Sequence, residues 1–245
     1  EHSDPLMRTY LEDLIYRLSE TSEVRDRRFE FVILEDKTIN AFAAPGGIIG
    51  INIGMFLNTE KEGELASVMC HELAHLSQRH FARSQNRSSP LANALMILGS
   101  IAVAAASRNP EAIMIAPAAM QQMSINYTRS NEKEADRIGF NNLVKAGFDP
   151  DDMTMMFQRM QDKYQNEDSE QFSYLMTHPL PSERLTDMRI RSDSLKKTSN
   201  NSFRDNMDFY LVQKRAQIWA EKDTKKLIKK FKKGQKSQNK NTTVH

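Results

Sequence analysis

The most informative segment of the sequence is His71-Glu72-Leu73-Ala74-His75, which lies in a longer run of helical periodicity. On a helix, positions i and i+4 share one face, so the two imidazoles can reach a single ion. Zn²⁺ binds neutral imidazole nitrogen, and two ligands one turn apart suit its tetrahedral geometry. Glu72 points slightly off that face, where it can act as a base rather than as a ligand. We therefore expect His71 and His75 to bind zinc and Glu72 to be catalytic; two ordinary surface histidines are the alternative.

A second acidic motif, Asn-Glu-Lys-Glu-Ala-Asp at 131–136, begins in the helical stretch downstream of the zinc helix. Glu132 and Asp136 are again at i and i+4, so they share a face of a second helix. A catalytic zinc site needs a third protein ligand, and we expect Glu132 to supply it. Asp136 can accept the free N–H of a zinc-binding histidine. Glu134 should face away from this side of the helix, and the alternative for the whole motif is a solvated charged surface.

Two other residues near the zinc helix could be mistaken for ligands. His80 follows His75 by five residues, which places it half a turn out of phase for the same ion. We expect His80 at the surface or beside a ligand, and we expect Cys70 to be a small buried hydrophobe.

The surrounding pattern indicates a mainly helical α+β fold with a small antiparallel sheet. Asp4 and Pro5 form a helix start, and Pro45-Gly46-Gly47 marks a turn between two extended runs. We expect strands at 28–34, 39–44 and 48–53. We expect helices at 5–20, 62–83, 91–106, 111–146, 149–164, 182–193, 204–219 and 222–233.

Composition excludes several classes of protein. The 245 residues suffice for one large domain with an appendage, and the single cysteine excludes an internal disulfide and a Cys-rich zinc finger. Eight of the lysines follow Asp223; without them, 26 basic residues stand against 32 acidic ones, a net charge of −6 for residues 1–223. An acidic body argues against a nucleic-acid partner. The longest apolar run, 91–106, is shorter than the ~20 residues of a membrane-spanning helix.

Together these motifs resemble metallopeptidase family 48, a gluzincin family that includes the CAAX prenyl endopeptidases. The likeness rests on Ile39 to Gly47, on Leu65 to Arg83 and on the 131–136 motif, and it covers about residues 5–195. It is greatest to the periplasmic, β-barrel assembly-enhancing branch of the family. The resemblance implies a gluzincin zinc metallopeptidase domain that binds one Zn²⁺ per chain and cleaves peptide bonds within proteins.

The resemblance also implies a place and a set of partners. It implies an exported, periplasmic protein whose signal segment is absent from this chain. The implied substrates are unfolded or misassembled envelope proteins, with the outer-membrane assembly machinery as a further partner. We expect a peptidase domain at 1–195, a linker at 196–203, a helical pair at 204–235 that could begin a tetratricopeptide-type array, and a lysine-rich disordered tail at 236–245.

A His-Pro segment with a later arginine occurs at His178, Pro179 and Arg184. In the family a matching segment packs over the zinc site. His178 could then occupy the open zinc position as a plug, or donate a hydrogen bond to the oxyanion as a catalytic residue; a surface loop histidine is the alternative. We expect Arg184 to anchor the following helix and to lie among the substrate-binding residues. Arg129 could orient a ligand or bind a substrate carbonyl, or form a salt bridge within the helices.

Two further segments are candidates for contact with substrate. The strand Asn40-Ala41-Phe42-Ala43 has small side chains that would let an extended peptide add to its edge, although core packing explains them equally well. The apolar stretch 91–106 could cover the active-site cleft or, within 91–120, make a peripheral membrane contact. Burial in the core is the alternative for that stretch.

One rival function comes from another class. The chain could be a chaperone-like binding module whose zinc site is structural or latent. Zinc held entirely by protein side chains, with His178 as the fourth ligand, would favour that hypothesis.

Overall fold

Asp4 starts the first helix, as the sequence predicts: its carboxylate accepts hydrogen bonds from the N–H groups of Leu6 and Met7. The computed structural model describes residues 2–85, 129–166, 173–196, 206–221 and 225. The strands are β1 (Glu30–Leu34), β2 (Ala41–Ala44) and β3 (Ile48–Asn52). The helices are α1 (Pro5–Thr21), α2 (Ile53–Asn58), α3 (Glu62–Ser77), α4 (His80–Gln85), α7 (Arg129–Lys145), α8 (Asp151–Asn166), α9 (Ser173–Thr177), α10 (Ser182–Lys196) and α11 (Met207–Ala220).

The fold class is confirmed, but the sheet is mixed rather than antiparallel. Its strand order is β1-β3-β2; β3 is antiparallel to β2 and parallel to β1. β1 and β2 do run in opposite directions, as the short connection between them requires. The tight turn after β2 makes β3 antiparallel to β2, so β3, which lies between the two strands, is parallel to β1. Local patterning indicates which residues form strands, and it does not indicate this order.

The β2–β3 turn depends on two glycines. Gly46 and Gly47 have φ angles of 91° and 82°, which L-residues with a Cβ rarely adopt. A Cβ on Gly47 would also lie 2.3 Å from the carbonyl oxygen of Arg28. This turn holds β2 at one edge of the sheet.

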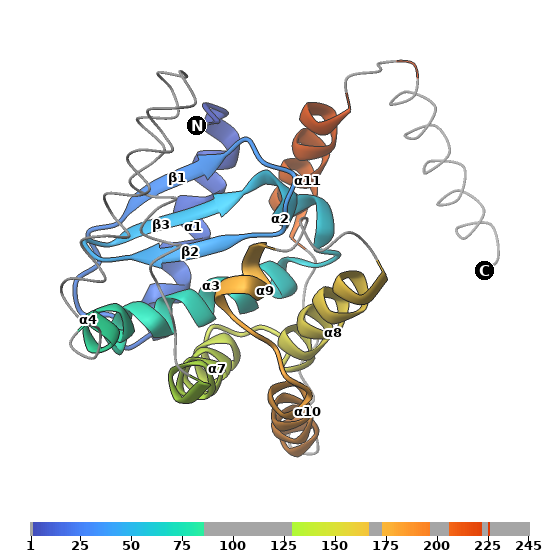
Figure 1. The fold of residues 1–245 in the computed structure, drawn as a ribbon. Helices are drawn as coiled ribbons and strands as arrows, with labels where there is room; N and C mark the ends of the chain where they lie inside the picture. Colours follow the sequence, from blue (N-terminus) through green and yellow to red (C-terminus); the bar gives the residue numbers. More distant parts are fainter. Residues whose placement is uncertain (1, 86–128, 167–172, 197–205, 222–224, 226–245) are drawn as a thin grey trace, which may run out of the picture.

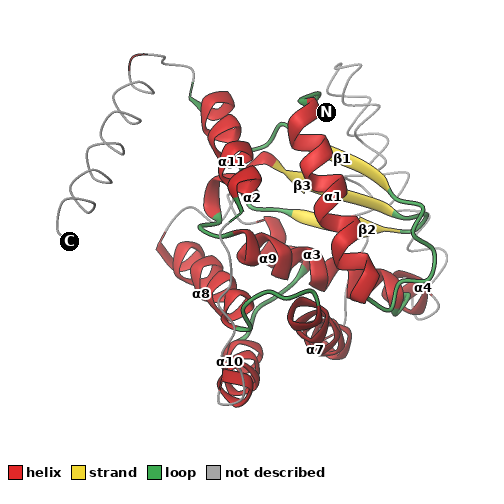
Figure 2. Ribbon diagram, turned by 180° about the vertical axis from the view of Figure 1, so that it is seen from behind, coloured by secondary structure: helices red, strands yellow, loops and turns green. Residues whose placement is uncertain are grey.

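Helix α3 is the centre of the molecule. Figure 1 shows it between the sheet on one side and α7, α8 and α10 on the other, and Figure 2 shows α1 crossing in front of the sheet, on the side where it also contacts α3. Every residue of α3 from Glu62 to His75 is buried. A helix covered on all sides has no solvated face, so the polar residues within it need partners inside the protein.

The predicted helix 62–83 is interrupted. Arg79 has a φ of +52°, and α3 ends before it at Ser77 while α4 begins after it at His80. The prediction of one continuous helix was therefore wrong at this point. The break turns the chain back, so that His80 contacts His75 of α3, which its spacing in the sequence does not suggest.

Apart from α9, which was not predicted, the later helices agree with prediction where the structure describes them. These are α8, α10, α11 and the second half of the predicted helix 111–146, which is α7. Some predicted features lie outside the described residues. They are the helix 91–106, the candidate contact region 91–120 and, apart from residue 225, the helix 222–233. Within the described ranges, no helix is both long enough and apolar enough to cross a membrane.

Candidate active site

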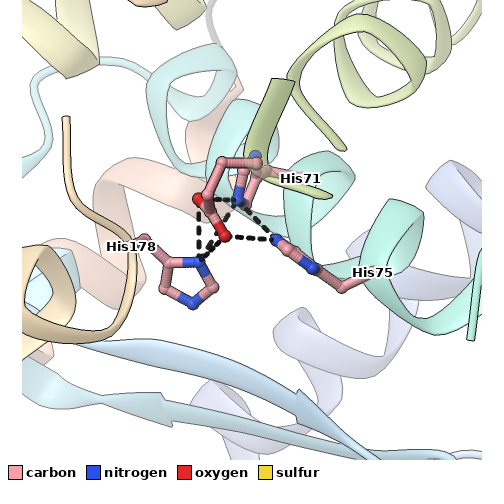
Figure 3. Close-up of side chains that lie close together, drawn as sticks. His71, His75 and His178 are labelled. Carbon is pink, nitrogen blue, oxygen red and sulfur yellow. Dashed lines mark hydrogen bonds and ion pairs between the residues drawn. The ribbon is translucent and has the colours of Figure 1, made fainter. Parts of the chain in front are cut away.

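Four buried side chains from three parts of the chain meet at the middle of α3. They are His71 and His75 of α3, Glu132 of α7, and His178, which follows α9. One ligand atom of each lies within 4.8 Å of the others. Figure 3 shows the three imidazoles pointing toward one another. Sequence spacing predicts the pairing of His71 with His75, and the tertiary fold adds the other two.

The separations within this cluster are short and of similar size. Nε2 of His71 lies 2.9 Å from Nε2 of His75 and 3.4 Å from Nδ1 of His178. The carboxylate of Glu132 lies 3.3 Å from His75 and 3.2 Å from Nδ1 of His178. Four potential ligand atoms thus surround one point, an arrangement that could hold a metal ion.

The second nitrogen of His71 is oriented by α7. Its Nδ1 lies 3.0 Å from Oδ1 of Asp136, and Arg184 of α10 donates to both oxygens of that carboxylate at 2.6 and 2.7 Å. Arg184 also lies 2.9 Å from Glu132 and donates to the carbonyl oxygen of Pro179. Arg184 therefore connects the two acidic residues of α7 to the segment that carries His178. The sequence predicted an anchoring role for this arginine, but not its contact with Asp136.

The second nitrogen of His75 is held by residues of the α3–α4 corner. Its Nδ1 lies 2.8 Å from Nδ1 of His80, and Nε2 of His80 lies 3.0 Å from Oε2 of Glu134. Arg83 donates to the same oxygen at 2.8 Å. Glu134 stays out of the four-residue cluster, as expected, yet it is connected to that cluster through His80.

Glu72 lies beside the cluster without joining it. Its Oε2 accepts a hydrogen bond from the N–H of Ala43 in β2 at 3.1 Å, and its Oε1 has no hydrogen-bond partner among the described residues. Nε2 of His178 lies 3.5 Å from this Oε1. Burial raises the pKa of Glu72. A carboxylate with one oxygen fixed and one oxygen unpartnered suits a general base.

Burial and the nearby acids set the protonation of the two histidines of α3 differently. Burial alone would lower the pKa of His71, but its contacts with Asp136 and Glu132 outweigh burial and raise that pKa to about 9. Burial lowers the pKa of His75 well below its usual value. Burial would raise the pKa of Glu132, yet the three imidazoles around it hold that pKa well below the usual range. Binding of a metal requires neutral imidazole and therefore competes with a proton on His71.

The charges and donors fit a bound cation. When the imidazoles are neutral, as metal binding requires, three buried carboxylates, those of Glu72, Glu132 and Asp136, stand against one buried guanidinium, that of Arg184. Buried charge is costly unless it is paired or coordinates a metal. The unpartnered oxygen of Glu72 is a second sign that a group is expected at this point.

Tyr174 of α9 is a site residue that sequence reasoning missed. Its ring stacks on that of His178, with centroids 4.6 Å apart and an interplanar angle of 26°. It is buried, and its hydroxyl has no hydrogen-bond partner among the described residues. Its N–H donates to the carbonyl oxygen of Ile39, just before β2. The only sequence signal would have been its position one helical turn before His178.

The predicted substrate-binding strand lies at the edge of the sheet. Asn52 donates to the carbonyl oxygen of Asn40, which places Asn40, Phe42 and Ala44 in register to pair with β3. Ala41 and Ala43 then turn their backbone groups away from β3, consistent with the bond from Ala43 to Glu72. All four residues from Asn40 to Ala43 are buried.

A cavity of about 1550 Å³ extends from this site. Its wall includes Ala43 and Ala44 of β2, the β2–β3 turn, His75, and the α3–α4 corner. Arg129, for which a role in substrate binding stays a prediction, is the exposed first residue of α7. Among the described residues, no ion pair joins Arg129 to the cluster. Cys70 is buried and accepts a hydrogen bond from Asn142, away from the cluster.

Comparison with known proteins gives one family and several relatives. Residues 5–192 match the family model for peptidase family M48. A putative β-barrel assembly-enhancing protease of Vibrio cholerae is 45% identical over 195 residues, 78% of this chain and 40% of that protein. The β-barrel assembly-enhancing protease of Escherichia coli is 38% identical over 222 residues, 87% of this chain and 44% of that protein. The mitochondrial metalloendopeptidase OMA1 of Schizosaccharomyces pombe is 27% identical over 176 residues, 72% of this chain and 50% of that protein. The chain thus spans less than half the length of the two bacterial relatives.

Proposed function

Since the chain belongs to peptidase family M48, we propose that it is a zinc-dependent endopeptidase with one Zn²⁺ held by His71, His75 and Glu132. The observation that carries this proposal is the convergence of these three side chains beside Glu72, which has one unpartnered oxygen. Two imidazole nitrogens and one carboxylate are the donor set of many catalytic zinc sites.

Each residue has a defined part in hydrolysis. A bound zinc ion supplies a Lewis acid for the peptide carbonyl and makes water a stronger acid. Glu72 removes the proton from the attacking water and delivers it to the leaving amine, while Ala43 fixes the other carboxylate oxygen. Asp136 holds the imidazole of His71 in the orientation that ligation requires.

The edge of β2 is the proposed binding surface for the peptide. An extended substrate that adds to this edge would pair with the backbone groups of Ala41 and with the carbonyl oxygen of Ala43, since the N–H of Ala43 already bonds Glu72. These backbone hydrogen bonds do not depend on the substrate's sequence. The bond from Ala43 to Glu72 supports this assignment, because it links the strand edge directly to the base. The adjoining cavity provides room for the substrate on one side of the site.

His178 is proposed as a plug of the fourth zinc position. Its Nδ1 lies as close to Glu132 and His71 as the two other imidazoles lie to their neighbours, which supports ligation. The competing role is a hydrogen bond to the oxyanion during catalysis. If the plug never leaves, the zinc is latent and the chain acts as a chaperone-like binding module, the second candidate function.

The relatives' names suggest the substrates and the compartment. Bacterial relatives are named for enhancement of β-barrel assembly. We therefore propose unfolded or misassembled envelope proteins as substrates, the outer-membrane assembly machinery as a partner, and the periplasm as the compartment. The proposal for residues 204–235 remains the start of a helical repeat array, of which α11 is the first helix.

The test is cleavage of an unfolded protein. Reduced casein is incubated with the chain as purified, after treatment with a zinc chelator, and after addition of zinc to the treated sample. The proposal predicts cleavage by the chain as purified, no cleavage after the chelator, and cleavage again once zinc is added back. If the chain binds zinc but none of the three samples cleaves casein, the binding module is favoured instead.

A further inference from the structure

His80 is a fully buried histidine that the proposed mechanism does not use. It is the first residue of α4, and its side chain has no solvent exposure. Both ring nitrogens are engaged: Nδ1 lies 2.8 Å from Nδ1 of His75, and Nε2 lies 3.0 Å from Oε2 of Glu134. Arg83 donates to the same oxygen of Glu134. The four side chains form a continuous chain of polar contacts from the exposed side of α7 to the proposed zinc ligand.

The chemistry of these contacts allows only one arrangement of protons when His75 binds a metal through Nε2. His75 must then carry its proton on Nδ1 and donate it to Nδ1 of His80. His80 in turn carries its proton on Nε2 and donates it to the carboxylate of Glu134. Every donor thus meets an acceptor, and Arg83 balances the charge of Glu134 at the end of the chain.

The second ring nitrogen of His71 is held in a simpler way, by direct contact with an acidic residue. Nδ1 of His71 lies directly against Asp136, and Arg184 balances that carboxylate. The residue at the corresponding distance from Nδ1 of His75 is His80. His80 occupies that place and transmits the contact to Glu134, two residues before Asp136 on the same helix.

The break at Arg79 is what makes this contact possible. In a continuous helix, His80 would lie half a turn out of phase with His75. The positive φ of Arg79 ends α3 and lets His80 begin a new helix that folds back on His75. A residue forced into this part of φ/ψ space points to a local geometry that serves the site.

We propose that His80 is a positioning residue that fixes the tautomer and ring orientation of His75, and that Glu134 and Arg83 in turn fix His80. This inference rests on the metal-binding part of the proposed function. It assigns Glu134 a role in zinc affinity that its position outside the cluster does not suggest.

The test measures zinc affinity of the whole chain by competition with a chromophoric chelator, without any substrate. His80→Phe keeps the ring volume and removes both nitrogens; we expect the zinc dissociation constant to rise about 10- to 100-fold. His80→Gln places an acceptor oxygen and a donor nitrogen at a spacing similar to that of the two ring nitrogens, and it should recover most of the loss. Glu134→Ala should cause a smaller loss, and Lys133→Ala, an exposed neighbour on α7, should cause none.

A second readout separates positioning from general stability. The visible absorption of the Co²⁺-substituted chain reports ligand geometry, and it should change in His80→Phe and return in His80→Gln. Equal zinc affinity and equal spectra in wild type and His80→Phe would overturn the inference, and so would a Gln variant no better than Phe. If His80→Phe does not fold, unchanged zinc affinity in Glu134→Ala would overturn it instead. A chain that binds zinc in this pattern but cleaves no casein would contradict the proposed function and leave this inference standing.

Discussion

Gly139 lies directly against the backbone of His71. A Cβ at Gly139 would lie 2.9 Å from the amide nitrogen of His71 and 3.0 Å from the carbonyl group of Cys70. Because this glycine has no side chain, α7 approaches α3 closely enough for Glu132 and Asp136 to reach the imidazoles. The distance between the two helices is therefore part of the site.

Gly139→Ala should separate α3 from α7. We expect a fall of about 1–3 kcal/mol in the free energy of unfolding, because backbone rather than a flexible side chain meets the added methyl group. Zinc affinity should fall as well, since Glu132 and Asp136 move with α7. Denaturant unfolding and chelator competition measure the two effects. Arg137→Ala, an exposed change on the same helix, should alter neither; a Gly139→Ala chain with wild-type affinity would contradict this role.

Arg184 should not be replaceable by lysine. Its planar guanidinium binds both oxygens of Asp136 and also reaches Glu132 and Pro179, and an ammonium group cannot reproduce that set of contacts. Arg184→Ala should lower the free energy of unfolding by about 3–5 kcal/mol, because it removes the buried guanidinium that pairs with both Asp136 and Glu132.

Thermal and denaturant unfolding test this expectation. Arg184→Lys should recover only part of the loss. The exposed pair of Arg191 and Asp187 on the same helix gives the comparison, and Arg191→Ala should cost less than about 1 kcal/mol. Full recovery by lysine would show that charge alone matters at this position.

Asp152, at the start of α8, should make the protein less stable as pH rises. Burial, followed by the nearby charge of Asp149, raises the pKa of Asp152 to about 7 from its usual value of 3.8. The folded state therefore binds this proton more tightly than the unfolded chain does. The contribution of Asp152 to the free energy of unfolding then falls as pH rises from about 4 to 7 and stays low above that range.

The measurement is the melting temperature at pH 5 and pH 8. At pH 8 the melting temperature of Asp152→Asn should be higher than that of wild type. At pH 5 the two melting temperatures should lie closer together. Asp162→Asn, an exposed change on the same helix, should show no such pH dependence. An Asp152→Asn chain that is less stable than wild type at pH 8 would mean that the ionised carboxylate is favourable there.

His178→Ala distinguishes its two proposed roles by the sign of the change. If His178 is a plug, removal of its side chain exposes the fourth zinc position, and basal proteolysis of casein should rise. A donor to the oxyanion is needed for turnover, so proteolysis should fall by about 10²- to 10³-fold. Met176→Ala, exposed on α9, is the control for disturbance of this segment. Activity equal to that of wild type would exclude both roles.

Much of the site could be predicted because it depends on helical spacing. His71 with His75, and Glu132 with Asp136, are pairs at i and i+4, and local sequence suffices to place each pair on one helix face. The stacking of Tyr174 on His178 and the contact of His80 with His75 could not be predicted. The first depends on how α9 packs against β2, and the second on a helix break at Arg79 that no glycine or proline marks in the sequence.

The fold was predictable to the same extent. The positions of the strands follow from their residue types and from the Pro45-Gly46-Gly47 turn. The parallel pairing of β1 with β3 depends on the order of strands in the sheet, which is decided by packing over the whole domain. Likewise, the close contact at Gly139 depends on the neighbouring helix, and a lone glycine inside a helical pattern does not reveal it.

The central claim is that Glu72 acts on a metal ion held by His71, His75 and Glu132. The most direct measurement determines zinc content and casein hydrolysis in the same preparations of wild type and Glu72→Gln. The account predicts about one zinc per chain in both proteins and hydrolysis lowered by about 10²- to 10⁴-fold in the variant, because the substitution removes a base and no ligand. Wild-type hydrolysis by Glu72→Gln, or loss of its zinc, would contradict the account.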